Sequence, residues 1–384
     1  PGTVDGNILM YGHLDKQPEM EGWEDGLGPW TPVMKDGKLY GRGGADDGYA
    51  LFASISSVLA LKEQGIAHPR ILVLIEFSEE SGSPDLPHYM ELCAEKIGTP
   101  DLVICLDSGA GDYKRFWSTT SLRGLIGLSM KVEVLSEGVH SGGASGHVPS
   151  SFRIARKLLS LIEDENTGEI LVDELHTQIP EHRLKETEKL VSILGNEVVE
   201  EFPWKNGMKP STNDNVEGVL RRTWRPALSI VGSDGLPPTA NAGNVLRPYT
   251  TLQLSMRIPP MIDAKKATEA IKKKLTESIP YEASVKLHFE EAADGWNAPE
   301  TSPWLIEAIE KASVNYFNEK PCSISEGGTI PFMAMLGERF PNAQFVITGV
   351  LGPQSNAHGP NEFLHIPFAK KLTCCISSII SDFQ

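Results

Sequence analysis

Residues 71–80 read ILVLIEFSEE, a run of apolar residues that ends in two adjacent carboxylates. Three further runs, Asn7–Gly12 (NILMYG), Leu102–Leu106 (LVICL) and Ala343–Gly349 (AQFVITG), are also near-continuous in apolar character. Strands covered on both faces of a parallel sheet have this pattern, whereas half-exposed strands alternate. Because helical patterns such as Tyr49–Gln64 separate the runs, we expect an α/β fold with a mostly parallel sheet and right-handed crossovers.

The chain changes in character after about Trp117. Its strand-like stretches there alternate apolar and polar residues, which favours an antiparallel sheet with one solvent-exposed face. They are Gly127–Leu135, Ala227–Val231, Tyr249–Arg257 and Ala283–Glu290, with helical stretches at Phe152–Glu163, Leu184–Glu201 and Ala264–Ser278. The α/β pattern then resumes, so we predict one domain from residues 1–117 and 297–384 and an α+β domain inserted at 118–296. Two sequential domains would leave the strand at 343–349 without a sheet.

The composition excludes several classes of protein. The chain has 384 residues, with 35 Lys+Arg against 51 Asp+Glu, and a net charge of −16. Nucleic acid is excluded as a partner, because a phosphate binder needs a cationic face. No apolar run approaches the roughly 20 residues that span a bilayer, so no membrane partner is expected. Five cysteines without a CxxC pair indicate a reducing, cytoplasmic location. Since the chain starts at Pro1 and soon enters a strand, we expect a preceding N-terminal segment.

Chemically active side chains follow the apolar runs. In open α/β sheets, ligands bind outside the carboxyl ends of the strands, so these side chains should meet at one edge. They are His13 and Asp15, Glu79 and Glu80, Asp107, and His358, together with Asp46 in the turn GRGGADDG. Two imidazoles and five carboxylates cannot gather as bare charges, because like charges repel in a desolvated site. Without a thiolate among them, the set points to zinc, manganese or cobalt.

Each of these short patterns also has an ordinary explanation. A lone HxD is common, an EE pair often ends a solvated helix, and His358 alone suits a loop. The turn GRGGADDG resembles a phosphate loop but has no P-loop Lys-Ser/Thr. No GxSxG elbow indicates a Ser-His-Asp hydrolase. It is the joint occurrence at successive strand ends that predicts a metal site.

Longer motifs extend the pattern over nearly the whole chain. They are MYGHLDKQP, LYGRGGADDG, EFSEESGS, CLDSG, RGLIGLSMKVEV with GVHSG, GNVLRP, LSMRIPP, SEGGTIP and NAHGPNE, between residues 10 and 362. In this order they resemble the co-catalytic zinc metallopeptidases that include carnosinase, cytosolic nonspecific dipeptidase, aminoacylase, carboxypeptidase G and succinyl-diaminopimelate desuccinylase. The long insertion after HSG is most similar to the carnosinase-like dipeptidase branch. The resemblance implies a phosphorylase/hydrolase-like catalytic domain with an inserted lid and dimerisation domain, and a homodimer formed through that lid.

The resemblance also implies roles for individual residues. Two divalent metal ions per subunit are implied, most often zinc, with manganese or cobalt as alternatives. One ion would be held by His13 and Asp107, the other by Glu80 and His358, and Asp46 would bridge both; Asp15 would orient His13, and Glu79 would be the general base. A cis peptide is implied at Asp46–Asp47. His140 would reach the oxyanion from the partner subunit, and substrate would be bound by Arg257, Asn244, Gly327, Gly328 and Thr329.

The implied activity is hydrolysis of the peptide bond in dipeptides or short peptides, with a metal-bridged water as nucleophile. One alternative is an N-acyl amino acid amidohydrolase such as succinyl-diaminopimelate desuccinylase or acetylornithine deacetylase. Another is a non-catalytic metal-binding dimerisation module, against which the free Glu79 beside Glu80 speaks. Three of the implied functional residues also have a purely structural explanation. Arg257 could be a strand arginine with a packed stem, His140 could cap a turn, and Asn244 could be a turn residue before a strand. The sequence differs from the family's usual pattern at Asp47–Tyr49 and at Ala144 and Ser145. These differences remove no implied metal ligand, so they bear on which substrate is cleaved and not on hydrolysis itself.

Overall fold

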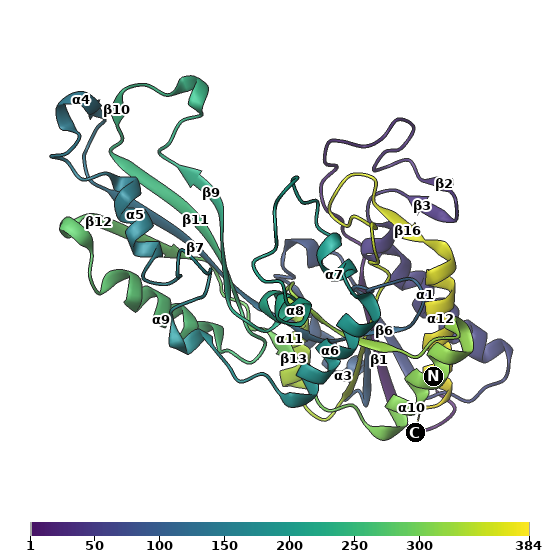
Figure 1. Ribbon diagram of the computed structural model, residues 1–384. Coiled ribbons are helices and arrows are strands. Elements are labelled where there is room, and N and C mark those ends of the chain that lie inside the picture. The colour runs from purple at the N-terminus through teal and green to yellow at the C-terminus, as the bar shows by residue number, and fades with distance from the viewer. Residues whose placement is uncertain (1, 384) are drawn as a thin grey trace.

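The computed structural model describes residues 2–383, and its centre is a four-stranded parallel sheet (Figure 1). The strand order is β15-β5-β1-β4, and all three neighbouring pairs are parallel. The strands are β1 (Asn7–His13), β4 (Arg70–Glu76), β5 (Leu102–Cys105) and β15 (Gln344–Ile347). These are the four apolar runs of the sequence, so the predicted α/β class and parallel sheet are confirmed.

Both faces of this sheet are covered, which explains the continuous apolar runs. In β1, Ile8 and Met10 point into one core and Leu9 and Tyr11 into another, because successive strand residues face opposite sides. The first core is closed by α1 (Tyr49–Glu63), α10 (Pro303–Phe317) and α12 (Ile366–Ser381). The second is closed by α2 (Leu86–Leu92) and α11 (Pro331–Arg339), with α3 (Ala94–Ile97) after α2. The helices α2 and α3 are divided at Cys93.

Two smaller sheets pack with the parallel sheet and its helices, and together they make up the first body of the molecule. The first joins β6 (Trp117–Leu122) in parallel to β14 (Cys322–Glu326) and antiparallel to β13 (Trp296–Asn297). The second is antiparallel and contains β2 (Val33–Lys35), β3 (Lys38–Tyr40) and β16 (Phe363–His365). Both sheets bring residues near the C-terminus beside residues more than 200 positions earlier in the chain.

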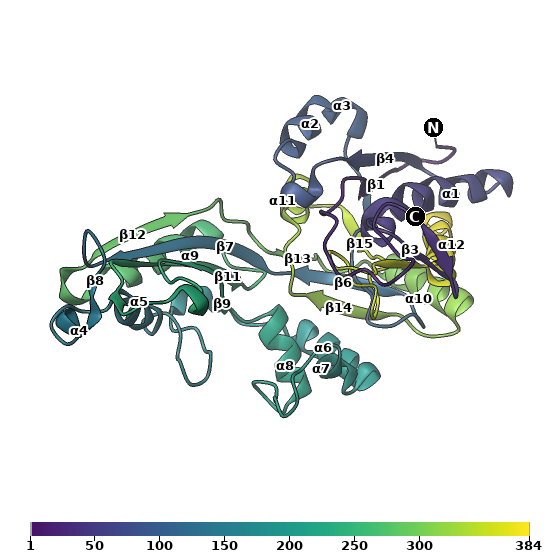
Figure 2. The same cartoon turned by 90° about the horizontal axis from the view of Figure 1, so that it is seen from above.

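The lid is an antiparallel sheet that extends away from the first body (Figure 2). Its order is β12-β7-β11-β9, formed by β7 (Gly124–Glu133), β9 (Ala227–Asp234), β11 (Tyr249–Ile258) and β12 (Ser284–Phe289). Buried positions alternate along β11, as the sequence pattern predicts for a sheet with one covered face. The covering helices are α5 (Ser151–Leu159) and α9 (Ala264–Thr276). At the far tip lie β8 (Val139–His140), α4 (Ser141–Ala144) and β10 (Val245–Leu246).

Part of the inserted segment packs on the first body instead of the lid. This part contains α6 (Glu181–Leu194), α7 (Glu197–Glu200) and α8 (Asn215–Thr223). Leu190, Val198 and Val219 from these helices belong to the same hydrophobic core as Ile8. Residues 118–296 thus contribute to two cores, and the lid proper consists of the strands and helices around β7 and β11.

The helices of residues 2–383 are all too short or too polar to cross a membrane.

Candidate metal centre

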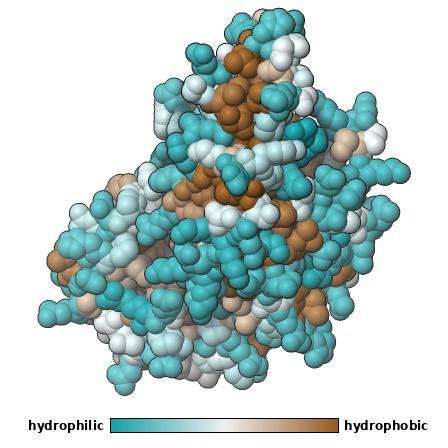
Figure 3. Space-filling model, turned by 90° about the vertical axis from the view of Figure 1, so that its left-hand side faces the viewer, coloured by the Kyte–Doolittle hydropathy of each residue, from teal (hydrophilic) through white to brown (hydrophobic). Residues whose placement is uncertain are grey.

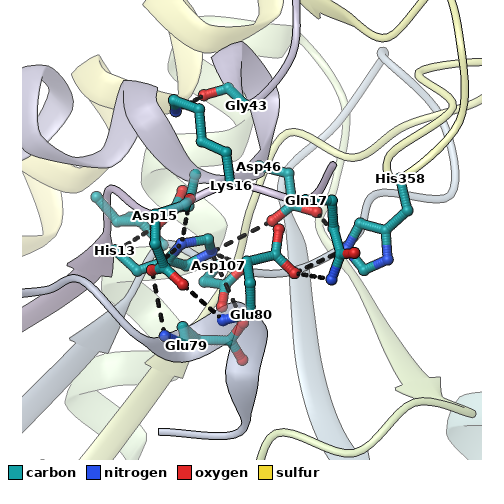
Figure 4. Close-up of polar contacts among 12 residues, drawn as sticks. His13, Asp15, Lys16, Gln17, Gly43, Asp46, Glu79, Glu80, Asp107 and His358 are labelled. Carbon is teal, nitrogen blue, oxygen red and sulfur yellow. Dashed lines mark hydrogen bonds and ion pairs between the residues drawn. The ribbon is translucent and has the colours of Figure 1, made fainter. Parts of the chain in front are cut away.

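The side chains that follow the strands come together at the carboxyl edge of the parallel sheet (Figure 4). His13 ends β1, Asp107 follows β5, and His358 lies in the loop after β15. Asp46 stands between the two imidazoles: its Oδ1 is 3.3 Å from His13 Nε2, and its Oδ2 is 2.9 Å from His358 Nε2. The other distances are 3.7 Å from Asp107 Oδ1 to His13 Nε2 and 3.3 Å from Glu80 Oε2 to His358 Nε2. The carboxylate of Asp46 therefore has the arrangement of a bridging ligand.

The turn that carries Asp46 lies unusually close to β1. A Cβ atom on Gly12 would lie 2.5 Å from Ala50 Cβ and 2.7 Å from Asp47 Oδ2, so this position requires glycine. The amide of His13 donates to Asp47 Oδ2 at 3.2 Å, which ties the turn to the end of the strand. The peptide bond Asp46–Asp47 is cis, as the family resemblance implies.

Asp15 holds both the His13 ring and the turn Glu79–Ser81. Its Oδ1 lies 3.3 Å from His13 Nδ1, and it accepts hydrogen bonds from the amides of Glu79 at 3.2 Å and Glu80 at 2.9 Å. With Nδ1 directed at Asp15, the Nε2 atom of His13 faces the carboxylate cluster. This Nε2 is buried and has no hydrogen-bond partner within the described chain. The carbonyl of Asp15 also lies 3.2 Å from Nδ1. A metal ion between His13 and the carboxylates would satisfy Nε2, because metal-bound histidines direct their other nitrogen to a carboxylate or a backbone carbonyl.

The crowding of carboxylates raises the pKa of several groups. Burial, reinforced by the charge of Asp107, raises the pKa of Glu79 to about 8. Burial lowers the pKa of His13, but the carboxylates of Asp107 and Asp46 outweigh it and raise the pKa to about 12. Hydrogen bonds with Asp46 and Glu80 raise the pKa of His358 to about 10. The raised pKa values mean that the cluster favours bound protons on Glu79, His13 and His358. Divalent cations would displace these protons on binding.

The residues fit divalent metal ions at two neighbouring positions, one beside His13 and one beside His358, whose Nε2 lies 2.9 Å from Asp46 Oδ2 and 3.3 Å from Glu80 Oε2. Ligand atoms of His13, Asp46 and Glu80 all lie within 4.8 Å of one another, and so do those of His13, Asp47 and Asp107. Imidazole and carboxylate donors of this kind suit zinc, manganese or cobalt. Asp47 is suited to a different task, because burial raises its pKa well above the usual value and its Oδ2 already accepts from the His13 amide. It holds the strand end in place.

A cavity of about 920 Å³ opens beside the cluster. Asp46, Glu79, Asp107 and His358 line one part of it, and Gly328 and Thr329 line another. The cluster is therefore accessible from a space large enough for a small substrate.

Arg257 reaches this cavity indirectly. It donates from Nη1 to Thr329 Oγ1 at 2.8 Å, and that hydroxyl donates to the carbonyl of Arg123 at 2.6 Å. Arg123 in turn donates from Nε to the carbonyl of Gly327 at 3.1 Å. The predicted substrate residues Arg257, Gly327 and Thr329 thus form one connected group, joined by the buried Arg123 at the base of the lid.

His140 ends β8 directly before α4, and Asn244 directly precedes β10; Figure 1 shows α4 and β10 at the tip of the lid, away from the parallel sheet. Both side chains are exposed, and the amide of Ser141 donates to the carbonyl of Asn244 at 2.9 Å. His140 Nδ1 accepts the amide of Gly142 at 3.1 Å, so within one chain this side chain caps the turn. The fold brings these two residues to each other but not to the metal cluster.

Sequence analysis missed side chains that support the cluster. Gln17 donates from Nε2 to Glu80 Oε2 at 2.8 Å, and Arg222 lines the cavity. The position of Gln17, four residues after His13 in the same strand-end loop, was an available signal. No sequence signal pointed to Arg222, because its helix α8 reaches the cavity only through packing on the first body.

Comparison with known proteins identifies the family of the chain. A cysteinylglycine-S-conjugate dipeptidase of Corynebacterium striatum is 25% identical over 94% of this chain and 79% of its own length. A Cys-Gly metallodipeptidase of Schizosaccharomyces pombe is 29% identical over 84% of this chain and 69% of its own. The crystal structure of human carnosine dipeptidase 1 superposes with a TM-score of 0.77 at 20% identity, covering 98% of this chain and 80% of that one. Peptidase family M20/M25/M40 matches residues 9–382, and the chain is a metallopeptidase-type hydrolase of that family.

Proposed function

We propose that this enzyme hydrolyses the peptide bond of dipeptides with two divalent metal ions, most often zinc, held at the edge of the parallel sheet. The observation that supports it best is the position of Asp46, whose two oxygens face the Nε2 atoms of His13 and His358 at 3.3 and 2.9 Å. His13 and Asp107 would hold one ion, Glu80 and His358 the other, and Asp46 both. Bound there, the ions would supply Lewis acidity for the scissile carbonyl and lower the pKa of an attacking water.

Glu79 is the proposed general base. Its Oε2 lies 4.0 Å from His13 Nε2, beside the proposed ligands but outside both ligand groups. It lines the cavity, so a carboxylate oxygen is available to a water molecule and to a substrate. In this role Glu79 takes a proton from the attacking water and returns it to the nitrogen of the leaving amine. Asp15 keeps the turn Glu79–Ser81 in place through the amides of Glu79 and Glu80.

Arg257 is the proposed ligand for the substrate's carboxylate. A guanidinium group suits a carboxylate because it donates two parallel hydrogen bonds. Arg257 is half-buried and bonded to Thr329, which lines the cavity together with Gly328. A free carboxylate next to Thr329 would therefore lie near the charged guanidinium of Arg257, while Gly328 forms part of the cavity wall.

The choice of dipeptides rests on the relatives, among them a beta-Ala-His dipeptidase of Homo sapiens that is 26% identical over 87% of this chain and 66% of its own length. The test is amine release from protein stripped of metal, with and without added zinc or manganese. The panel would contain β-Ala-His, Cys-Gly, other α-dipeptides, succinyl-diaminopimelate and N-acetyl amino acids. Metal-dependent cleavage of dipeptides is expected. Cleavage of acyl substrates alone would move the function to deacylation, and no turnover would favour a non-catalytic module.

Glu79→Gln tests the assignment of the base. The variant should bind metal as the wild type does, while kcat falls by about 10²- to 10⁴-fold, the usual contribution of a general base. Glu200→Gln is a matched control, because Glu200 is also a glutamate that lines the cavity but lies outside the cluster. Near-normal turnover by Glu79→Gln, or an equal loss in the control, would remove Glu79 from this role.

A homodimer through the lid would bring His140 and Asn244 to the partner's site. Both are exposed at the lid tip, where they have no access to their own cluster. Apolar surface on the lid side (Figure 3) supports a covered face: in β9, an edge strand, Ile230 is 46% and Val231 63% exposed. A mixture of His140→Ala and Glu79→Ala subunits should recover part of the activity, because one site of the mixed dimer is intact. No recovery in mixed dimers that are shown to form would argue against shared sites.

A cytoplasmic location remains part of the proposal. All five cysteines are free in the structure, which suits a reducing compartment.

A further inference from the structure

A buried ion pair outside the cavity joins residues that are 320 positions apart. Arg42 Nη1 donates to Glu362 Oε2 at 2.6 Å, and the two side chains are 1% and 0% exposed. Neither residue lines the cavity or belongs to a group of potential metal ligands. A buried ion pair contributes little net stability on average, because desolvation offsets the attraction. The contacts of the pair indicate a role other than stability.

The pair holds three loops, and each carries proposed metal ligands or supports one. Glu362 Oε1 accepts the amide of Gly43 at 2.9 Å and is 3.4 Å from the amide of Asp46, so it fixes the turn with the bridging carboxylate. Arg42 Nη2 donates to the carbonyl of Gly359 at 2.9 Å, directly after His358. Arg42 Nε donates to the carbonyl of Pro18 at 3.2 Å, directly after Gln17, the side chain that bonds Glu80.

The loop with His358 needs such an external anchor. Gln354, Asn356, His358 and Asn361 all have positive φ, from 54° to 65°, in the left-handed region that non-glycine residues rarely occupy. The side chain of His358 is itself 54% exposed, so packing does little to hold it. A segment with this backbone persists only when its surroundings determine it. Arg42 and Glu362 supply that restraint from within the first body.

We propose that Arg42 and Glu362 act as a positioning pair that sets the spacing of Asp46 and His358, and thereby the affinity of the site for divalent ions. The inference rests on the proposed metal site. Each arm of the guanidinium or carboxylate holds a different loop, so removing the pair loosens the loops that carry Asp46 and His358, while the pairing of β3 with β16 keeps the flanking strands together. Neither residue touches substrate, and the pair acts only through the loops.

Three variants test this proposal: Glu362→Gln, Arg42→Lys and the double variant Arg42→Gln/Glu362→Gln. The lysine keeps the charge but cannot reproduce the three-way guanidinium contact, and the double variant leaves no unpaired buried charge. The matched control is Arg183→Gln/Glu186→Gln, an ion pair at 2.9 Å whose arginine is 4% exposed and also bonds the carbonyl of Ala298. Co²⁺ binding to stripped protein would be followed by calorimetry and by the visible spectrum, and unfolding of the metal-free protein by denaturant.

The expected result is a metal-free fold like the wild type, Co²⁺ affinity reduced about 10- to 100-fold, as when a support of a metal ligand is lost, and an altered Co²⁺ spectrum. The control should bind Co²⁺ as the wild type does. Wild-type affinity and spectrum in any folded variant would overturn the proposal. So would failure of all three variants to fold, because the pair would then be a folding element. If the wild type itself binds no Co²⁺, the proposed function fails, which is a separate result.

Discussion

Asp15 offers the sharpest test of how the metal centre is held. Its carboxylate accepts the amides of Glu79 at 3.2 Å and Glu80 at 2.9 Å and lies 3.3 Å from His13 Nδ1. In Asp15→Asn, the amide nitrogen cannot accept, so one of the two backbone amides loses its acceptor and the charge is lost from the other. A hydrogen bond to a charged group contributes about 1.5–3 kcal/mol. The Asp15 side chain is 18% exposed, so water compensates for part of the lost interaction. We therefore take the free energy of one charged hydrogen bond as the net loss.

This loss corresponds to a reduction in metal affinity of about 10- to 150-fold, since each 1.4 kcal/mol is about tenfold. Calorimetric titration of stripped protein with zinc measures it, and kcat/KM for a cleaved dipeptide should fall at least as far. Asp164→Asn is the matched control: Asp164 Oδ1 accepts the amides of Asn166 at 2.8 Å and Thr167 at 2.9 Å in an exposed turn of the lid. Unchanged zinc affinity in Asp15→Asn, or an equal loss in Asp164→Asn, would refute the reasoning.

Three further predictions concern substrate, pH and packing. Arg257→Ala should raise KM for dipeptides about 10- to 150-fold, the loss of one charged hydrogen bond, but leave KM for dipeptide amides unchanged; equal effects on both would contradict carboxylate binding. Burial raises the pKa of Glu326 from 4.5 to about 7, so the folded state binds more protons between these values and stability falls as pH rises through that window. Denaturant titrations at pH 4.5 and 8 should show Glu326→Gln gaining stability relative to the wild type at the higher pH, and no such gain would refute the shift. Gly12→Ala should cost about 1–3 kcal/mol of unfolding free energy by overpacking against Ala50, whereas Gly143→Ala, with open space around it, should cost far less.

The central sheet could be predicted from local patterns alone. A strand covered on both faces must be apolar at every position, and Ile8 to Tyr11 satisfy this by facing two cores in alternation. The ligand cluster was predictable for a related reason. Parallel strands end at one edge of the sheet, so His13 after β1 and Asp107 after β5 meet there however distant they are in the chain.

Other parts of the fold depend on long-range packing that a local pattern does not encode. The apolar face of α6 predicts that Leu190 is buried, but not that it joins the core of the first body instead of the lid. The strands β6 and β14 have mixed composition and become a sheet only because Trp117 and Cys322 are brought side by side. Sequence motifs likewise marked His140 as functional without placing it at the lid tip.

The sequence by itself determined the parallel sheet, the inserted antiparallel lid and the identity of the side chains at the strand ends. These follow from the periodicity of single strands and helices and from the order of elements along the chain. Only the tertiary structure decided which of those side chains face each other, as the two oxygens of Asp46 face His13 and His358. It also decided what holds them there: Arg42 and Glu362 are 320 residues apart, and no local signal relates them. The physical reason is that a buried ion pair depends on where the whole chain folds, whereas a strand depends on its own few residues.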